Sequence, residues 1–516
     1  MQIRKTNRDY ASSNFTLPSP VGGLNCRDSL DLMAATDAIV MDNYFPGETK
    51  VSLRRGYVKY VGLPFATKTL LEYKSPTENR LLACSGGNVY DISSSSAVKI
   101  YEREFYRSYW QSCLFKNRLF MVNGIDEPQV FYVDETGDHF EAVSFNGDGL
   151  EVKNLVNVCV SKQRLFFAEK GSLNVWYSEE AGEVQGNLLK FDLSAIARCG
   201  GDIRAIACWT QDGGQGMDDL TVFITSEGEA IVYSGNDPSN YEDWTLKGVY
   251  RLSKPIGYQC ILPYQGDVVI ISEDGYIPLS KALPLDKAGG SQVAFSDKIR
   301  SLVLERTRVN RYKDGWQGII YSRGGYAIFN VPTAQQFEQH VINLNTGAWC
   351  RFTNIRAYCW GMLDGRLYFG SDDGVFLFDE GYSDNQTPIM GHIEQAYSNL
   401  GSDNLKKIQL INPRTTASAK YALVVYTNMD FESKDKQYAE NIGSSGVTKW
   451  NAVSWSSLAS PNGTKWASLQ GKIRSQWIAN SATGFKASLV FKTKTRGNLI
   501  EWYDTGFRYE QGSGIL

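Results

Sequence analysis

The sequence predicts an all-β protein in which a β-propeller is followed by a β-sandwich-like domain. Its 516 residues include 48 Gly, 29 Tyr, 24 Phe and 12 Trp, a composition that favours strands and tight turns. A strand–turn–strand pattern recurs through the middle of the chain and stops near residue 384. Many short strands separated by regular turns are typical of propellers and sandwiches.

Composition and charge exclude several classes of protein. The 53 Lys and Arg against 56 Asp and Glu give a net charge of -3, so the chain lacks the basic surface of a general nucleic-acid binder. No apolar run approaches the ~18 residues of a membrane-spanning helix, and the polar N-terminus lacks the apolar core of a signal peptide. The odd count of nine Cys fits a reducing compartment. We therefore expect no membrane span and assembly in a cytoplasm.

Residues 1–56 precede the repeats and form the first expected part of the chain. Residues 34–42 predict a short helix, which Pro46 and Gly47 end, and residues 51–58 predict a strand. So short a segment buries too little apolar surface to fold alone. We expect it to pack on the propeller or to supply a strand that closes it.

Residues 57–384 form the expected propeller. Each repeat combines two apolar strands with a polar turn, and the turns hold Gly-Gly, Glu-Gly or Asp-Gly pairs that suit tight hairpins. Seven such units begin 38 to 56 residues apart, at Arg80, Arg118, Arg164, Leu220, Asp267, Gly318 and Arg366. This spacing is typical of propeller blades. Six to eight blades are compatible with it because residues 211–219 look like an insertion, and seven fits best; a β-sandwich array is the competing architecture.

Single cysteines recur at one position of these units. The strand before the hairpin carries Cys113, Cys159, Cys208, Cys260 or Cys359. Disulfides or metal sites would instead pair cysteines within a unit. A lone recurring Cys suits a small, apolar and tightly packed position, which predicts the innermost strand of each blade.

Residues 385–516 lose the repeat and form the third expected part. Six candidate strands there suffice for a small β-sandwich. The polar stretches 432–449 and 456–463 predict long loops that are either plain loops or an interaction surface. Five Trp fall in this part: Trp450, Trp455, Trp466, Trp477 and Trp502. We favour core packing for them over stacking on sugars or anchoring a partner.

The sequence offers no catalytic, cofactor-binding or metal-binding set, so we expect a protein that is not an enzyme. The three His lie far apart, and the common metal, phosphate and nucleophile motifs do not occur. Neighbouring carboxylates such as Asp372 and Asp373 fall at turns, where Asp is favoured for its backbone hydrogen bonds. A glycosidase built on paired carboxylates is the weakest alternative.

Each end of the chain carries a distinctive pattern of residues. The opening pattern consists of Gly23, Leu24, Asn25, Ala38, Asn43, Pro46, Val51, Arg55 and Gly56. The closing strand contributes Gly506, Tyr509 and Glu510. Both patterns resemble the two ends of tail proteins of short-tailed bacteriophages, in the family of the tail nozzle, also called the packaged-DNA stabilisation or tail tubular protein.

The resemblance implies a structural virion protein without catalytic residues or cofactors. Nozzle proteins form a ring, expected here to be a homohexamer, below the portal and adaptor proteins. The ring extends the DNA channel, helps to retain the packaged genome and conducts it during ejection without sequence-specific binding. Tail fibres or spikes dock on its outer face. The chain is then expected in the virion tail after assembly in the host cytoplasm, with the Arg54–Gly56 turn packing the first strand.

A receptor- or glycan-binding propeller at the tail periphery is the alternative function. The Trp-rich end of the chain and its long polar stretches motivate this second hypothesis.

Overall fold

The structure is a computed structural model that describes residues 12–101, 104–212, 217–282, 294–334, 336–418, 421–434 and 473–512. Strands dominate these residues, and the helices longer than one 3-10 turn are α1 (Leu279–Ala282) and α2 (Arg300–Asn310). The expected all-β class is confirmed. No helix within the described ranges is long and apolar enough to cross a membrane.

The chain folds into two compact units, each built from segments that are not continuous in sequence. We call residues 59–340 and 354–378 the repeat unit, and residues 1–58, 341–353 and 379–516 the terminal unit.

The repeat unit consists of small sheets that follow one another in chain order. Most contain four antiparallel strands, with the first strand in sequence at one edge. The first three sheets are β7 (Thr67–Lys74), β8 (Asn79–Ser85), β9 (Asn88–Asp91) and β10 (Val98–Lys99); β11 (Gln111–Phe115), β12 (Arg118–Val122), β13 (Gln129–Asp134) and β14 (Gly137–Ala142); and β16 (Leu155–Ser161), β17 (Arg164–Glu169), β18 (Asn174–Ser178) and β19 (Gly186–Asp192), with β15 (Phe145–Asn146) parallel to β19. The next two are β20 (Ile203–Asp212), β21 (Met217–Thr225), β22 (Glu229–Ser234) and β23 (Thr245–Arg251); and β24 (Ile261–Tyr264), β25 (Asp267–Ser272) and β26 (Gly275–Pro278). The last two groups are β27 (Gln317–Tyr321), β28 (Tyr326–Pro332) and β29 (Phe337–Asn343); and β31 (Cys359–Leu363), β32 (Arg366–Ser371), β33 (Gly374–Phe378) and β6 (Tyr57–Gly62).

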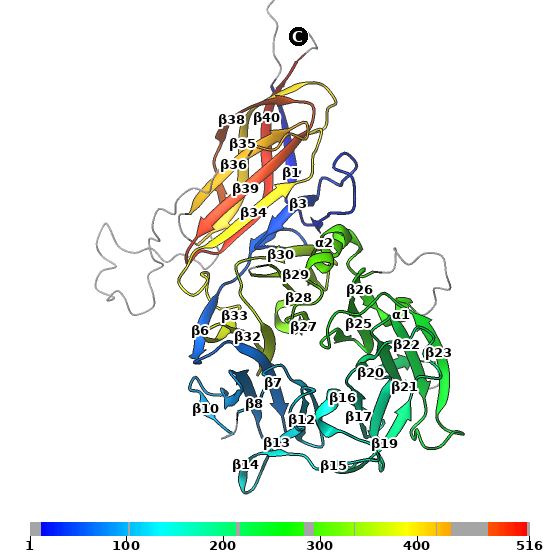
Figure 1. Ribbon diagram of the computed structural model, residues 1–516. Helices are drawn as coiled ribbons and strands as arrows, with labels where there is room; N and C mark the ends of the chain where they lie inside the picture. The colour runs from blue at the N-terminus through cyan, green and yellow to red at the C-terminus, as the bar shows by residue number, and fades with distance from the viewer. Residues whose placement is uncertain are drawn as a thin grey trace, which may run out of the picture. The chain divides into compact units, whose positions relative to one another are not determined.

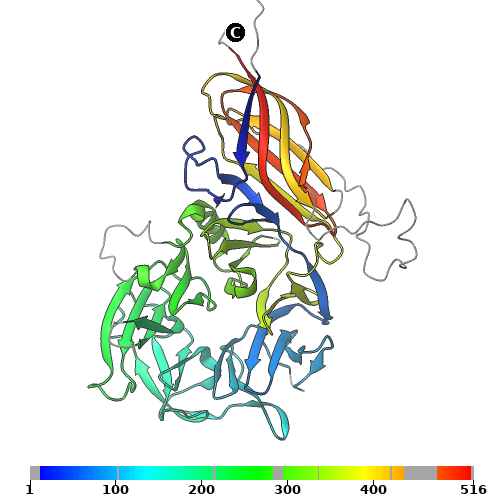
Figure 2. The ribbon, with the colours of Figure 1, turned by 180° about the vertical axis from the view of Figure 1, so that it is seen from behind.

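The sheets of the repeat unit succeed one another around a ring, from blue β7 through cyan β12 to green β25 (Figures 1 and 2). The first strands of neighbouring sheets touch in turn: β7 with β11, β11 with β16, β16 with β20, β24 with β27, β27 with β31, and β31 with β7, while β20 touches β25. The apolar core lies between adjacent sheets. One cluster, for example, holds Phe120 of one sheet and Phe167 of the next, so each sheet is covered on its faces by its neighbours in a propeller-like way.

The predicted hairpins are present where the sequence placed them. Gly86 and Gly87 join β8 to β9 with φ of 57° and 79°, the left-handed region that tight turns require. The unit at Gly318 differs, because its hairpin is the first pair of strands in its sheet rather than the second pair.

The recurring cysteines lie on the first strands, as expected, but their packing varies. Cys113, Cys159, Cys208 and Cys359 lie in β11, β16, β20 and β31, and Cys260 comes directly before β24. Cys260 and Cys359 are buried, whereas Cys208 is exposed. The expectation of a tightly packed position therefore fails for Cys208, and each of these thiols is free.

The terminal unit contains two groups of strands. The first is β1 (Ser12–Pro18), β4 (Tyr44–Pro46), β5 (Val51–Leu53), β35 (Lys406–Ala417), β37 (Ile473–Ser475), β38 (Ile478–Gly484) and β40 (Ile500–Gln511); the second is β2 (Gly23–Leu24), β3 (Asp37–Asp42), β30 (Trp349–Phe352), β34 (Ile389–Gln395), β36 (Ala422–Met429) and β39 (Ala487–Thr495). Phe491 of the second group stacks on Trp502 of the first, with ring centroids 4.7 Å apart, and contacts Tyr44 edge-on at 5.9 Å. These three buried rings join the two layers.

Two expectations about residues 1–56 differ from the structure. Residues 37–42 form strand β3 rather than a helix, because Ala38 and Met41 are fully buried and pair with Gln395 and Ile393 of β34. Residues 12–56 belong to the terminal unit, because β1 pairs along its whole length with β40. The first and third expected parts of the chain thus form one compact unit, whose borders with the repeat unit at residues 58 and 379 lie close to the expected 56 and 384. The following strand, β6, joins the sheet of β31 to β33.

Most of the expected polar loops lie outside the described residues, since residues 435–472 are not described. The same holds for Trp450, Trp455 and Trp466. Two of the five Trp in residues 385–516 are described: Trp502 is fully buried, and the side chain of Trp477 is 46% exposed.

Candidate functional site

The residues of the two terminal motifs come together in the terminal unit. The closing-motif residues Gly506, Tyr509 and Glu510 pair with Thr16, Ser13 and Ser12 of β1, the strand just before the opening motif. The opening motif itself reaches β40 through Val51, which pairs with Trp502. The remaining motif residues, Gly23, Asn25, Asn43, Pro46, Arg55 and Gly56, lie in the same unit. The opening and closing motifs therefore build one β structure.

Two motif glycines lie where the backbone approaches another segment. Gly23 has φ of 80°, and a Cβ there would lie 2.5 Å from the carbonyl oxygen of Trp349. A Cβ at Gly56 would overlap the backbone of Ser383. These positions need glycine for reasons of space.

Asn43 is buried in the left-handed conformation, with φ of 60°, which Asn adopts more readily than most residues. Its Nδ2 donates to Thr353 Oγ1 at 2.8 Å and to the Met390 carbonyl at 2.7 Å. Its Oδ1 accepts from the Thr353 amide at 2.9 Å and from Arg54 Nε at 2.7 Å. This side chain ties three segments of the terminal unit together.

Arg54, rather than the motif residue Arg55, is the buried arginine of the turn. Its Nη1 and Nη2 donate to the two carboxylate oxygens of Asp384 at 2.8 and 2.6 Å, and the two side chains are 1% and 4% exposed. Further donations reach the carbonyls of Arg55 and Thr353. The Arg55 side chain is 43% exposed, with Asp379 at 3.8 Å.

Electrostatics at this junction are those of a buried structural pair. Burial raises the pKa of Asp384, and the Arg54 charge opposes that rise. Burial, together with the Asp384 charge, raises the pKa of the neighbouring Tyr57 to about 12. Because both oxygens of Asp384 accept from Arg54, the pair is suited to holding the fold rather than to proton transfer.

A second group of polar residues gathers in the repeat unit, at or just before the starts of the first strands. We call it the cation–tyrosine cluster; its members are Lys68, Arg107, Tyr109, Arg204, Tyr258, Arg356 and Tyr358. Lys68 of β7 and Arg204 of β20 occupy equivalent irregularities, because the pairing register shifts by one residue at each. Such bulges redirect a side chain out of the regular ladder.

Cation–π contacts connect the cluster. Lys68 Nζ lies 3.2 Å from the centroid of the Tyr358 ring and 6.0 Å from that of Tyr109. The Arg107 guanidinium lies 5.5 Å from the Tyr109 ring centroid. Arg204 covers the Tyr258 ring at 4.8 Å. The Arg107 charge also acts on the hydroxyl of Tyr258, whose pKa burial raises, so the two halves of the cluster are electrostatically joined.

Carboxylates pair with the cations of the cluster at different distances. Asp372 binds Arg356 Nε at 2.8 Å and accepts the Tyr358 hydroxyl at 2.7 Å. The other pairs are looser: Arg107 lies 3.6 Å from Asp314, and Arg204 lies 3.4 Å from Asp202. Lys68 forms no ion pair within 4.0 Å in the described part of the chain, and burial lowers its pKa.

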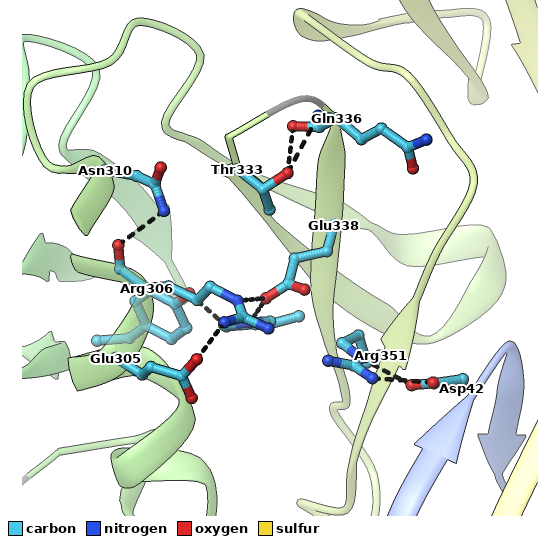
Figure 3. A network of polar contacts seen from close by, with 10 residues as sticks. Asp42, Glu305, Arg306, Asn310, Thr333, Gln336, Glu338 and Arg351 are labelled. Atoms are coloured by element: carbon cyan, nitrogen blue, oxygen red, sulfur yellow. Dashed lines mark hydrogen bonds and ion pairs between the residues drawn. The ribbon is translucent and has the colours of Figure 1, made fainter. Parts of the chain in front are cut away.

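One of the two histidines of the repeat unit, His340, is a buried hydrogen-bonded residue. His340 is fully buried, with Nδ1 2.8 Å from the Tyr276 hydroxyl and Nε2 3.1 Å from Glu338 Oε1. Arg306 of α2 lies between Glu338 and Glu305, as Figure 3 shows, and its Nε donates to Glu338 at 2.7 Å. Among the described residues, no three His, Cys, Asp or Glu side chains are grouped as metal ligands.

Asp372 and Asp373, one of the neighbouring carboxylate pairs, bind different partners. Asp372 binds Arg356 and Tyr358, whereas Asp373 pairs with Lys59 at 2.5 Å. Sequence reasoning did not find Arg54, Asp384 or the cation–tyrosine cluster. Their members are distant in the chain and share no local motif.

No family model and no curated protein sequence matches the chain. Solved structures with partial similarity include the extracellular domain of a B. thetaiotaomicron protein provisionally designated a one-component system, at 9% identity and a TM-score of 0.41 over 71% of this chain. The match covers 55% of that structure, so this chain spans about half its length. A Bacteroides fragilis protein provisionally designated a 6-phosphogluconolactonase matches at 10% identity and a TM-score of 0.35, over 67% of this chain and 91% of that one. Similarities at this level assign neither a family nor an activity to the chain.

Proposed function

We propose that this chain is the tail nozzle protein of a short-tailed bacteriophage. The observation that carries the proposal is the meeting of the two ends of the chain in one β structure, where Val51 of the opening motif pairs with Trp502 on the closing strand β40. Two motifs from opposite ends of the chain that form one structural unit are less easily explained as two independent chance matches. Their meeting therefore supports the resemblance to the nozzle family.

We further propose that the repeat unit is a seven-bladed β-propeller. Its successive sheets touch through their first strands, except that β20 touches β25, and the contact of β31 with β7 returns to the starting sheet. Strand β6, which precedes β7 in the chain, joins the sheet of β31 to β33. Pairing an N-terminal strand with the last sheet ties the two ends of a ring by hydrogen bonds.

In this proposal the protein forms a homohexameric ring below the portal and adaptor proteins and carries tail fibres or spikes outside. A closed ring of identical subunits needs two different complementary faces on each subunit. The slightly acidic chain, with a net charge of -3, suits a conduit that releases DNA, because clustered cations would hold phosphates strongly. The role requires no catalysis and no cofactor.

A receptor- or glycan-binding role at the tail periphery is the second candidate. The 46% exposure of Trp477 favours it, since exposed aromatic side chains stack on sugars or anchor partners. Binding of the purified protein to host cells that is lost in a Trp477→Ala variant would favour this role.

Electron microscopy tests the nozzle proposal. Images of the purified protein are expected to contain six-fold rings, and antibody labelling is expected to mark the tails of phage particles. Exclusively monomeric protein together with unlabelled tails would overturn the proposal.

A further inference from the structure

We propose that the cation–tyrosine cluster of the repeat unit binds the oxyanion of a small acidic ligand, such as a phosphate or a sugar carboxylate. The proposal rests on the geometry of the cluster and does not depend on the nozzle role.

The first support is the placement of two cations by irregular backbone. Lys68 and Arg204 stand at register shifts near the starts of β7 and β20. A regular strand would direct these side chains alternately to the sheet faces, where neighbouring sheets pack. The shift instead directs Lys68 onto the Tyr358 ring and Arg204 onto the Tyr258 ring. Bulges of this kind are common beside binding sites.

The second support is a set of unused hydrogen-bonding groups. Neither Lys68 Nζ nor the hydroxyls of Tyr109 and Tyr258 have a hydrogen-bond partner among the described residues. Burial raises the pKa of both phenols, which therefore stay protonated as donors at neutral pH. The ammonium of Lys68 lies over the rings of Tyr358 and Tyr109, and an ammonium and phenol hydroxyls are donors that the oxygens of an anion accept.

The third support is the loose pairing of the two nearby arginines. Arg107 and Arg204 reach their carboxylates only at 3.6 and 3.4 Å, so most of their N–H groups remain available. Arg356, by contrast, is held at 2.8 Å by Asp372 and serves to position Tyr358. The cluster thus separates into anchored residues and residues with free donors.

Charge selects an anion rather than a neutral ligand. Lys68 lies half-buried without a carboxylate within ion-pair distance among the described residues, which is unfavourable for an ammonium. A bound oxyanion would supply the missing partner. A nucleic-acid strand would need a continuous run of exposed cations, whereas these cations lie among carboxylates and tyrosine rings, which suits a small ligand.

Isothermal titration calorimetry of the full chain tests the proposal with inorganic phosphate, glucuronate and glucose. We expect at least one anion to bind, more weakly as salt is added, and glucose not to bind. Binding of phosphate alone would assign a phosphorylated ligand, and binding of glucuronate alone a carboxylated sugar. Absence of binding by both anions at low salt would overturn the proposal.

Variants connect the binding to the cluster. Lys68→Met is expected to weaken anion binding about tenfold or more, and Tyr109→Phe about three- to tenfold, because each removes one donor. Lys190→Met on β19 removes an exposed cation elsewhere in the repeat unit and is the matched control with unchanged affinity. Equal affinity of the wild type and Lys68→Met would contradict the proposal.

Thermal unfolding separates loss of binding from loss of folding. Lys68→Met removes a half-buried ammonium that has no carboxylate partner in the described part of the chain, so its melting temperature without ligand is expected to equal or exceed that of the wild type. Phosphate or glucuronate, whichever binds, should raise the melting temperature of the wild type and leave that of Lys68→Met unchanged. A rise of the same size in both proteins would place the bound anion elsewhere.

Discussion

Burying a guanidinium is unfavourable unless its N–H groups find acceptors, and Arg54 meets that condition. Two donations reach Asp384, and the others reach Asn43 and two carbonyls. Asn43 in turn uses its amide and its carbonyl oxygen to hold Thr353 and Met390. The junction is therefore satisfied as a network, and removing one member leaves the others unpaired.

Replacing Arg54 with Met should destabilise the terminal unit by about 3–5 kcal/mol, because Asp384 is left buried without its partner. The free energy of unfolding in urea measures this change. Arg55→Met, at the exposed neighbour, is the control and should stay within about 0.5 kcal/mol of the wild type. Similar urea midpoints for the two variants would mean that Arg54 is not the buried anchor.

The Lys50–Glu501 pair gives the terminal unit a pH dependence. Their side chains meet at 2.6 Å. The hydrogen bond to Glu501 raises the pKa of Lys50. Burial would raise the pKa of Glu501, but hydrogen bonds from Lys50, Thr416 and Tyr503 together lower it below 4.5. The carboxylate therefore contributes stability above pH 4.5 that is lost as the pH falls through its lowered pKa.

The expected result is a stability difference between the wild type and Glu501→Gln that is present at neutral pH and shrinks below pH 4.5. It should shrink again above pH 10.5, where the ammonium of Lys50 begins to be lost. Urea unfolding at a series of pH values measures the difference. A difference independent of pH would show that the charge of Glu501 contributes nothing.

At the scale of elements, strand β6 supplies the fourth strand of the sheet of β31 to β33. Val61 on β6 is 7% exposed and packs in a core cluster with Leu81 and Leu377. Val58 on the same strand is 38% exposed. One strand thus offers a buried position and an exposed one of the same residue type.

Val61→Asp should destabilise the repeat unit by about 3 kcal/mol or more, since it places a carboxylate in an apolar core. Val58→Asp should change the free energy of unfolding by less than about 1 kcal/mol. Limited proteolysis is expected to cut the Val61 variant within residues 354–378 and to spare the Val58 variant. Equal protection of both would contradict a closing role for β6.

The sequence predicted those elements whose signal is local. Hairpin turns such as Gly86–Gly87 can be predicted from the sequence because few residues other than glycine adopt the dihedral angles of these turns. Strand β3 was missed because its mixed apolar and acidic residues fit a helix equally well, and only pairing with β34 selects the extended form. Arg54 could not be paired with Asp384, since 330 residues separate them. The cation–tyrosine cluster draws on several sheets and is visible only once they are folded.

At the scale of the whole molecule, composition bears on whether the protein attracts DNA, which the proposed nozzle role requires it not to do. The net charge of -3 provides no general attraction for phosphates. The cations of the cation–tyrosine cluster lie among carboxylates and are too few to follow a duplex. The proposed nozzle, built from such chains, would surround DNA without binding its phosphates strongly.

The purified protein is therefore expected not to retard duplex DNA in a gel, even at about 50 mM salt, where electrostatic binding is strong. A basic DNA-binding protein run alongside verifies the conditions. A salt-sensitive shift would contradict the low-friction conduit and would point to a cationic surface that the net charge conceals.

The pairing of β1 with β40 also sets an order of events during synthesis. At about 5–20 residues per second, β40 leaves the ribosome tens of seconds after β1, once the strands of the repeat unit have been made. The repeat unit can close while β1, β3 and β5 still wait for their partner strands. The terminal unit is then the last part of the newborn chain to complete its strand pairing.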